Sequence, residues 1–135
     1  MNDSPTFDWP VRVYWEDTDA GGVVYYANYL KILERARTEW LSALGLEQDF
    51  LVRDAGVLFV VRRLEADYLR PARFNERLLV RSRLSELGRA SLVMVQDILR
   101  GSEHLLGARV QVACVEPVGF RPARIPGFVT ERLQP

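Results

Sequence analysis

The sequence predicts an α+β fold in which a five-stranded antiparallel sheet wraps around one long helix. Three observations predict it: a short β-prone stretch near the start, a single long stretch with helical spacing, and four later β-prone stretches joined by short turns. No repeat, linker or low-complexity tract divides the 135 residues, 48% of which are apolar. We therefore expect one domain over residues 1–135.

The first elements are a strand, a loop and the helix. Residues 11–15 alternate after Pro10 and predict a short strand, and residues 16–22 form a polar loop that contains two glycines. From residue 27 to residue 44 the apolar side chains recur every three or four positions, which predicts an amphipathic helix that ends at Gly45. Its apolar face consists of Tyr29, Leu30, Leu33, Ala36, Trp40, Leu41 and Leu44.

The remaining strands are predicted at residues 57–69, 77–87, 90–99 and 105–116. Short connections at residues 88–89 and 101–103 make them an antiparallel meander. In the first of the four, alternation assigns the even positions to one face, namely Leu58, Val60, Leu64, Ala66 and Tyr68. Long edge strands favour pairing with a second subunit, so we expect an oligomer.

Composition excludes several classes of function. The 18 basic and 18 acidic residues balance, which leaves no charge footprint for nucleic acid or an anionic membrane. No apolar run reaches the roughly 18 residues of a membrane span, and the single Cys114 fits a buried strand in a reducing compartment. We therefore expect a cytoplasmic protein without a transmembrane segment.

Metal and serine-nucleophile chemistry are also disfavoured. His104 is the only histidine, Cys114 is the only cysteine, and so a zinc site would need mostly carboxylate ligands. A Ser-His-Asp triad would have to use His104, which we place in the turn after Gly101, and no G-x-S-x-G segment is present. We predict neither a metal nor a cofactor.

The loop before the helix concentrates negative charge. Glu16, Asp17 and Asp19 lie within four residues, directly ahead of Gly21 and Gly22. Helix capping is one explanation, although Asp19 lies too far ahead of the helix to be a simple cap. The second explanation is catalysis, because adjacent glycines let backbone N–H groups approach a ligand carbonyl opposite a carboxylate. Local physics leaves both interpretations open.

A resemblance favours the second interpretation. The segment Trp15-Glu16-Asp17-Thr18-Asp19-Ala20-Gly21-Gly22-Val23-Val24-Tyr25-Tyr26-Ala27-Asn28-Tyr29 resembles the active-site signature of the 4-hydroxybenzoyl-CoA thioesterase family of hotdog proteins. Residues 33–39, Leu-Glu-Arg-Ala-Arg-Thr-Glu, are similar to the branch associated with the Tol-Pal envelope system. Residues 67–72 resemble the family's Tyr-x-x-Pro-Ala connection. The similarity covers almost the whole chain and implies a hotdog fold.

The resemblance also implies roles for individual residues. Asp19 matches the catalytic aspartate, which attacks the thioester or activates water. Tyr26 matches the position at the helix entrance whose backbone N–H polarises the thioester carbonyl, Gly22 gives room for that approach, and Tyr25 lies in the same substrate-binding segment. Many relatives in the Tol-Pal branch carry His at the position of Tyr26, but the implied role does not depend on its side chain.

The substrate pocket is predicted from the strand at 57–69. By resemblance, Phe59, Val60 and Val61 would line an acyl tunnel across a subunit boundary, although ordinary sheet packing also explains such residues. Arginine is suited to bidentate contacts with the phosphates of CoA. The candidates are Arg62, Arg63, Arg89, Arg121 and Arg124.

We therefore expect an acyl-CoA thioesterase that hydrolyses a fatty or aromatic acyl-CoA and acts as a homodimer or homotetramer. The main alternative is a non-catalytic protein that binds acyl thioesters or acyl-carrier protein as a scaffold in an envelope-associated system. A hotdog dehydratase is a third possibility, but such enzymes use a histidine beside the acid, and His104 is poorly placed for that role.

Overall fold

The computed structural model describes residues 5–134 and contains a five-stranded antiparallel sheet. The strands are β1 (Thr6–Arg12), β2 (Leu58–Tyr68), β3 (Arg77–Leu87), β4 (Ser91–Arg100) and β5 (Glu103–Val115). Their spatial order is β1-β3-β4-β5-β2, so β1 and β2 form the two edges. The predicted sheet is confirmed, and the last four strands lie within about two residues of their expected positions.

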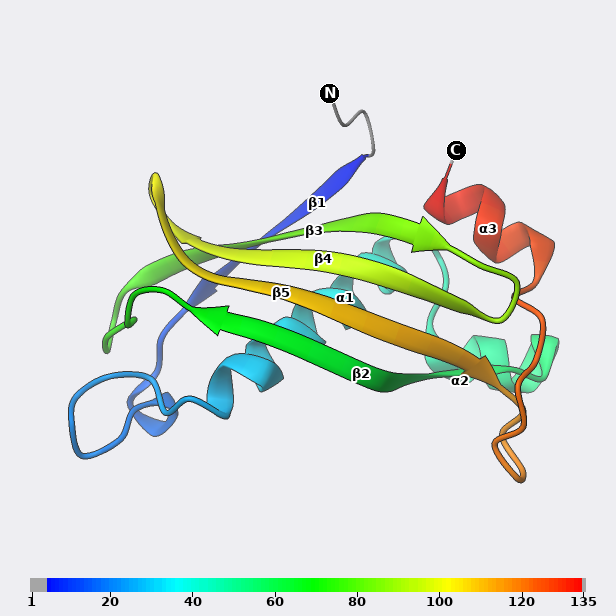
Figure 1. Ribbon diagram of the computed structural model, residues 1–135, viewed down its shortest axis with the longest axis horizontal. Coiled ribbons are helices and arrows are strands. Elements are labelled where there is room, and N and C mark those ends of the chain that lie inside the picture. Colours follow the sequence, from blue (N-terminus) through cyan, green and yellow to red (C-terminus); the bar gives the residue numbers. More distant parts are fainter. Residues whose placement is uncertain (1–4, 135) are drawn as a thin grey trace.

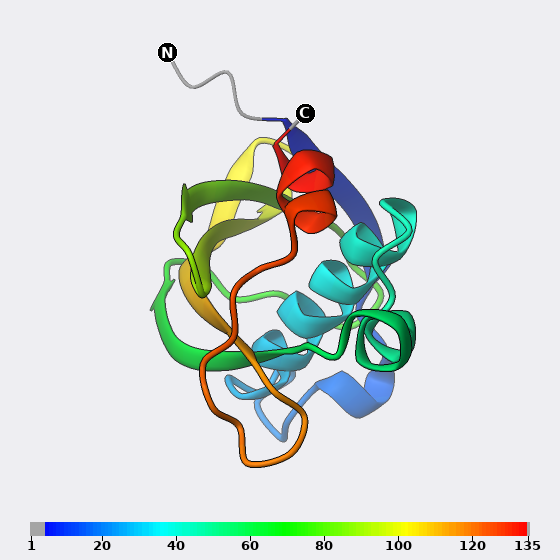
Figure 2. The same cartoon turned by 90° about the vertical axis from the view of Figure 1, so that its right-hand side faces the viewer.

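The long helix α1 (Asn28–Ala43) lies against the concave face of this sheet (Figure 1). Viewed along the strands, the sheet curls around the helix, as in the predicted hotdog arrangement (Figure 2). Fully buried side chains of α1, such as Ile32, Leu33 and Ala36, meet Val80, Ile98 and other inward residues of the sheet in one core. Burial of this apolar stripe stabilises the helix far more than intrinsic propensity does.

The first strand was predicted in the wrong place. β1 spans Thr6–Arg12 and pairs with β3 over its whole length, whereas Trp15–Asp17 form a single 3-10 turn, η1. The predicted strand begins after Pro10, but Pro10 lies inside β1, opposite Leu79. An edge strand tolerates proline, because alternate N–H groups on such a strand have no ladder partner.

The alternation predicted for β2 was also wrong in its first half. Pairing with β5 shifts register between Val61 and Arg63, which marks a β-bulge. Phe59 therefore shares a face with the buried Cys114, whereas Leu58 and Val60 take the opposite face. After the bulge the even positions, from Leu64 to Tyr68, face the core side as predicted.

Two short helical regions were not predicted. The first combines α2 (Gln48–Phe50) with a π-helical turn, η2 (Leu51–Ala55), and the second is α3 (Gly127–Leu133) near the end of the chain. Both are too short for a clear periodic signal, and they are held by the burial of Leu51, Val129 and Leu133. Among residues 5–134, no helix has the length and apolar character needed to cross a membrane.

Candidate active site

Asp19 lies at the start of a tight turn in the loop between η1 and α1. Its N–H donates to the Val23 carbonyl at 2.9 Å, and its carbonyl accepts from the Gly22 N–H at 3.0 Å. The carboxylate also accepts from the Gly21 N–H, with 2.8 Å between nitrogen and Oδ1. Three backbone contacts therefore fix the position of an exposed carboxylate.

The two glycines make this turn possible. Gly22 has φ +80°, a left-handed conformation that costs little only for glycine. At Gly21, a Cβ atom would lie 3.2 Å from Oδ1 of Asp19, against the carboxylate that the Gly21 N–H binds. The predicted importance of Gly22 therefore has a conformational reason, while Gly21 allows the close approach of the carboxylate.

The neighbouring acid Asp17 has a structural role in the loop. Its Oδ2 accepts from the Tyr14 N–H at 2.8 Å, which closes the η1 turn. Its carbonyl accepts from the Tyr25 N–H and from Nδ2 of Asn28, both at 3.0 Å. Asp17 thus ties the loop to the start of α1. Each of the two carboxylates accepts one backbone N–H, but Asp17 is half-buried, whereas Asp19 is exposed.

Tyr26 lies just ahead of α1, with Ala27 as the N-cap residue. Within residues 5–134 no acceptor is recorded for the Tyr26 N–H, in keeping with the unpaired N–H groups found at helix starts. The Tyr26 carbonyl accepts from the hydroxyl of Tyr68 at 2.9 Å. The Tyr26 carbonyl is therefore held from β2, while the Tyr26 N–H, in the preceding peptide unit, remains available to a ligand.

Aromatic side chains surround this entrance. The rings of Tyr25 and Tyr26 lie 4.9 Å apart, and Tyr68 packs edge-on against both Tyr26 and Tyr29. The pKa of Tyr25 is raised, mainly by a side-chain hydrogen bond with Tyr26 and to a smaller extent by the negative charge of Asp19. The pKa of Tyr68 is raised chiefly by burial. Both phenols therefore stay protonated and able to donate at neutral pH.

A second feature is a cavity of about 300 Å³ between α1 and the open edge of β2. Phe59, Val60 and Val61 all line it, as do buried side chains from β4 and β5 such as Met94 and Val112. This volume lies at the lower end of the range for small-molecule sites. The three predicted pocket residues therefore border one real cavity, and their contact with substrate remains a prediction.

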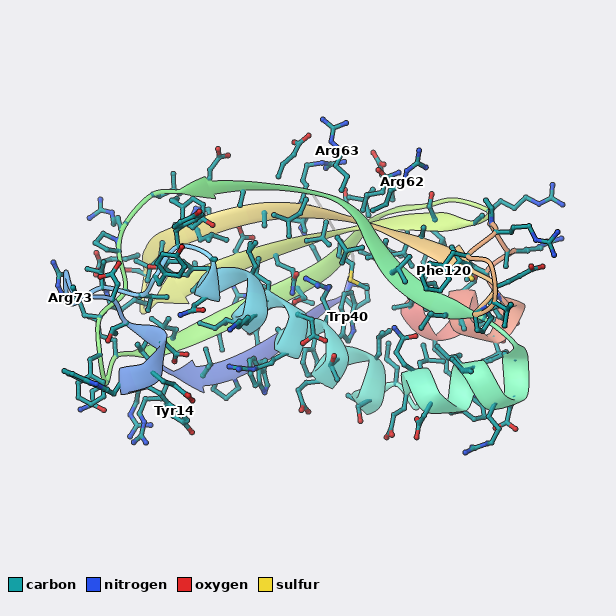
Figure 3. The ribbon with its side chains drawn as sticks, turned by 90° about the horizontal axis from the view of Figure 1, so that it is seen from below. Tyr14, Trp40, Arg62, Arg63, Arg73 and Phe120 are labelled. Carbon is teal, nitrogen blue, oxygen red and sulfur yellow. The ribbon has the colours of Figure 1, made fainter. Side chains whose placement is uncertain are left out.

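The arginines proposed for phosphate binding are dispersed. Arg62 and Arg63 lie on the face of β2 that points away from α1, where Arg63 pairs with Glu65 at 2.8 Å (Figure 3). Arg89 and Arg124 line a separate, open pocket beside α3. Arg121 pairs with Glu116. Within one protomer, none of the five lines the cavity that Phe59 borders.

The other nucleophile and base candidates lie elsewhere. His104 belongs to β5 and not to the predicted turn, and its Nε2 lies 2.7 Å from Oδ1 of Asp97. In the described residues no serine hydroxyl is hydrogen-bonded to it. Cys114 is buried as expected, and that burial raises the pKa of its thiol, which disfavours the reactive thiolate. No cluster of metal-binding side chains forms within residues 5–134.

Three residues of this region were missed in the sequence. Tyr68 enters the sequence analysis only as a strand residue and as the tyrosine of the Tyr-x-x-Pro-Ala connection. Arg37 enters it only as part of the segment 33–39, and Gln48 does not enter it at all. Arg37 interrupts a buried helix face, a signal that could have been read. The contacts of Tyr68 and Gln48 depend on tertiary folding and have no local signal.

The family model of the thioesterase superfamily, 4HBT, matches residues 21–106. This match begins two residues after Asp19 and so carries no information on that side chain. Acyl-CoA thioester hydrolase YbgC of Escherichia coli O6:H1 is 44% identical over 129 residues, which span 95% of this chain and 96% of that protein.

Two solved structures are similar to the chain. A probable thioesterase from Bartonella henselae has a TM-score of 0.86 and 38% identity, with 90% of this chain and 100% of that chain covered. A 4-hydroxybenzoyl-CoA thioesterase in complex with 4-hydroxybenzoyl-CoA has a TM-score of 0.89 at 19% identity, with 96% and 99% covered. At that identity, the second likeness concerns the fold alone.

Proposed function

This chain belongs to the thioesterase superfamily and is an acyl-CoA thioester hydrolase, and we propose that Asp19 is its catalytic carboxylate. The proposal rests on the difference between Asp17 and Asp19 in this loop. Asp17 is half-buried and ties the loop to the start of α1 through its carbonyl, whereas Asp19 is held by backbone groups with its carboxylate at the surface, beside the helix entrance. A fixed carboxylate near an unpaired N–H group is suited to acyl transfer.

In the proposed reaction, the thioester carbonyl oxygen accepts a hydrogen bond from the Tyr26 N–H. The positive end of α1 adds to the stabilisation of the oxyanion. By one route, Asp19 attacks the carbonyl carbon, the C–S bond breaks, CoA leaves as thiolate, and water hydrolyses the resulting anhydride. By the other, Asp19 removes a proton from the water that attacks directly. Either route yields the free acid and CoA.

We further propose that the enzyme is a dimer joined through β2. The side-chain amide of Gln48 pairs with both main-chain groups of Phe59, at 2.9 and 3.2 Å, and so blocks the open edge at that residue. Within residues 5–134 no comparable side-chain contact is recorded along the edge from Val61 to Tyr68, which can pair with the same stretch of a second copy. Antiparallel pairing of this stretch with itself places Val61 of one subunit beside Tyr68 of the other.

This dimer would complete the site. Tyr68 contacts the Tyr26 carbonyl, and Val61 borders the 300 Å³ cavity. An acyl group that reacts at one subunit would therefore enter the cavity of its partner, which accounts for the exposure of Asp19 and Tyr26 in a single chain. We also propose a cytoplasmic location, with the dimer or a dimer of dimers as the working form and acyl-carrier protein as a second acyl donor to test.

The test measures CoA release from short, long and aromatic acyl-CoAs by the wild type, Asp19→Asn and Glu16→Gln. We expect Asp19→Asn to lower kcat/KM by roughly 100-fold or more, since it removes the main catalytic group. The exposed Glu16, which has no recorded contact among the described residues, is the matched control and should retain full activity. Full activity of folded Asp19→Asn would refute the assignment.

The nucleophilic route can be detected by a single turnover in ¹⁸O-labelled water with enzyme in excess. Attack of water on the aspartyl carbonyl of an anhydride transfers label to the peptide that contains Asp19, and mass spectrometry detects it. Label in Asp19 therefore identifies the nucleophilic route. Label confined to the product acid is expected from the water that Asp19 activates, and also from an anhydride that water attacks at the acyl carbonyl.

A further inference from the structure

We propose that the cavity between α1 and β2 is a receptor for a carboxylate at the end of an apolar chain, with the Arg37 guanidinium as the group that binds it. The proposal rests on the proposed function in one respect, because the acyl group reaches this cavity from the site of the partner subunit. It adds a substrate preference that neither the family match nor the names of the relatives contain.

The cavity walls are mainly apolar, yet they include a buried cation. Arg37 is 9% exposed and lines the cavity together with Leu41, Leu92 and Met94. Arginine is rarely buried without a partner, because removal of a charge from water costs several kcal/mol. A buried guanidinium in an apolar cavity therefore requires a partner or a ligand.

The partner within the chain is neutral. Nη1 of Arg37 donates to Oε1 of Gln96 at 2.9 Å, and the Gln96 amide donates to the Leu33 carbonyl and to Oγ of Ser82. Gln96 and Ser82 are fully buried, so this network fixes the orientation of the guanidinium. Among residues 5–134, no carboxylate lies within ion-pair distance of Arg37.

The remaining nitrogens of Arg37 are not fully buried. No partner is recorded for Nε or Nη2, and none of the fully buried side-chain nitrogen or oxygen atoms in the described part of the chain lacks a partner. Nε and Nη2 must therefore retain access to solvent, and because Arg37 lines the cavity, the proposed site takes the cavity as the route of that access. These two nitrogens form the side of the guanidinium fork that binds a carboxylate through both oxygens.

Two charged side chains line the cavity, the buried cation of Arg37 and the exposed anion of Glu34, so only the end of the cavity at Arg37 favours a ligand anion. Burial is the main influence on Arg37 and lowers its pKa, and the negative charge of Glu34 opposes that effect from the rim. The Glu34 carboxylate is exposed and accepts a hydrogen bond from Oγ1 of Thr38 at 2.8 Å. A ligand carboxylate beside Arg37 would satisfy the guanidinium directly, while its apolar chain would contact Phe59, Leu92 and Met94.

Such a carboxylate has two sources. It can be the far end of a dicarboxylic acyl group whose other end is the CoA thioester, or it can be a free carboxylic acid such as the product of hydrolysis. The cavity of about 300 Å³ has the volume of roughly ten water molecules, so it suits a chain of moderate length. The chemistry that Arg37 recognises is the same in both cases.

The experiment compares kcat/KM for dicarboxylic monoacyl-CoAs of four to twelve carbons with plain acyl-CoAs of equal length. Parallel calorimetry measures the binding of hexanoate and decanoate. At one or more lengths we expect the wild type to favour the carboxylate-bearing substrate by about 10-fold or more, typical of a hydrogen bond to a charged group. Arg37→Met should remove that preference, and the readout is the ratio of the two kcat/KM values at each chain length.

Arg35→Met is the matched control, because Arg35 lies on the exposed side of the same helix and should leave the preference unchanged. If Arg37→Met does not fold, Val61→Glu keeps the Arg37 network and adds a competing carboxylate at the cavity, which should also remove the preference. Arg37-dependent binding of the free acids without a substrate preference supports the site and identifies the free acid as the source.

Equal rates for both substrate series, together with no binding of the free acids, would overturn the proposal. So would a preference that survives in both Arg37→Met and Val61→Glu. Neither result touches the assignment of Asp19, because plain acyl-CoA hydrolysis reports on it separately. Asp19→Asn, in turn, should lower the rates of both series equally and leave calorimetric binding of the acids intact.

Discussion

The loop of Asp19 and the network of Arg37 hold polar groups in opposite ways. Asp19 is exposed and positioned by backbone contacts to Gly21, Gly22 and Val23, whereas Arg37 is buried and positioned by the side chain of Gln96. An exposed carboxylate costs little free energy in the folded state, but its position for catalysis depends on the local backbone. A buried guanidinium destabilises the folded state unless neighbouring groups form hydrogen bonds with it. Changes in the loop should therefore affect activity, and changes in the network should affect stability.

The largest effect on stability should come from Gln96→Leu. This change leaves the Arg37 guanidinium and the Ser82 hydroxyl without their buried partner, and we expect a loss of about 2–4 kcal/mol in the free energy of unfolding. Denaturant titration measures it. Gln111→Leu, on a partly exposed site of β5, makes the same chemical change and should cost less than about 0.5 kcal/mol. Equal losses of stability in the two variants would contradict the conclusion that the buried network of Arg37 governs stability.

Gly22→Ala should have an intermediate effect, mainly on activity. Nothing lies within 4 Å of the added Cβ, so the cost of about 1–2 kcal/mol comes from the positive φ alone. Relief of that strain would move Asp19, and we expect kcat/KM to fall about 10-fold. Gly56→Ala carries a comparable strain at φ +66°, also in open space, and should lose similar stability with unchanged kcat/KM. An equal loss of activity in both would show that the turn has no special role.

The smallest effect should come from Tyr68→Phe. The change removes one hydrogen bond to the Tyr26 carbonyl, of about 1 kcal/mol, and preserves the ring contacts with Tyr26 and Tyr29. We expect kcat/KM to fall about 3-fold, with a loss of no more than about 1 kcal/mol in the free energy of unfolding. Tyr14→Phe, at an exposed ring without a recorded hydroxyl contact among the described residues, should match the wild type. A Tyr68→Phe enzyme with wild-type kcat/KM would show that β2 does not position the helix entrance.

The sequence by itself determined the order of the five strands and the long helix, the bounds of α1 and the last three strands, and the loop in which the candidate acid lies. These features follow from local periodicity, and the wide apolar face of α1 could be buried only against a sheet. The sequence also selected Asp19, through its resemblance to the signature of a thioesterase family. The local charge and spacing alone had left three acids as candidates. The distinction between Asp17 and Asp19 became physical only when the exposure of each side chain and the contacts of the Asp17 carbonyl were visible.

Tertiary structure decided the features that depend on pairing between distant segments. β1 pairs with β3 over residues 6–12, although the alternation in the sequence predicted a strand at residues 11–15. This pairing is possible because an edge strand can accept Pro10. The bulge after Val61 reversed the faces of Phe59 and Val60, since one extra residue shifts a two-residue period. The partner of Arg37 lies 59 positions away in β4, a contact that no local pattern encodes and that the packing of α1 on the sheet creates.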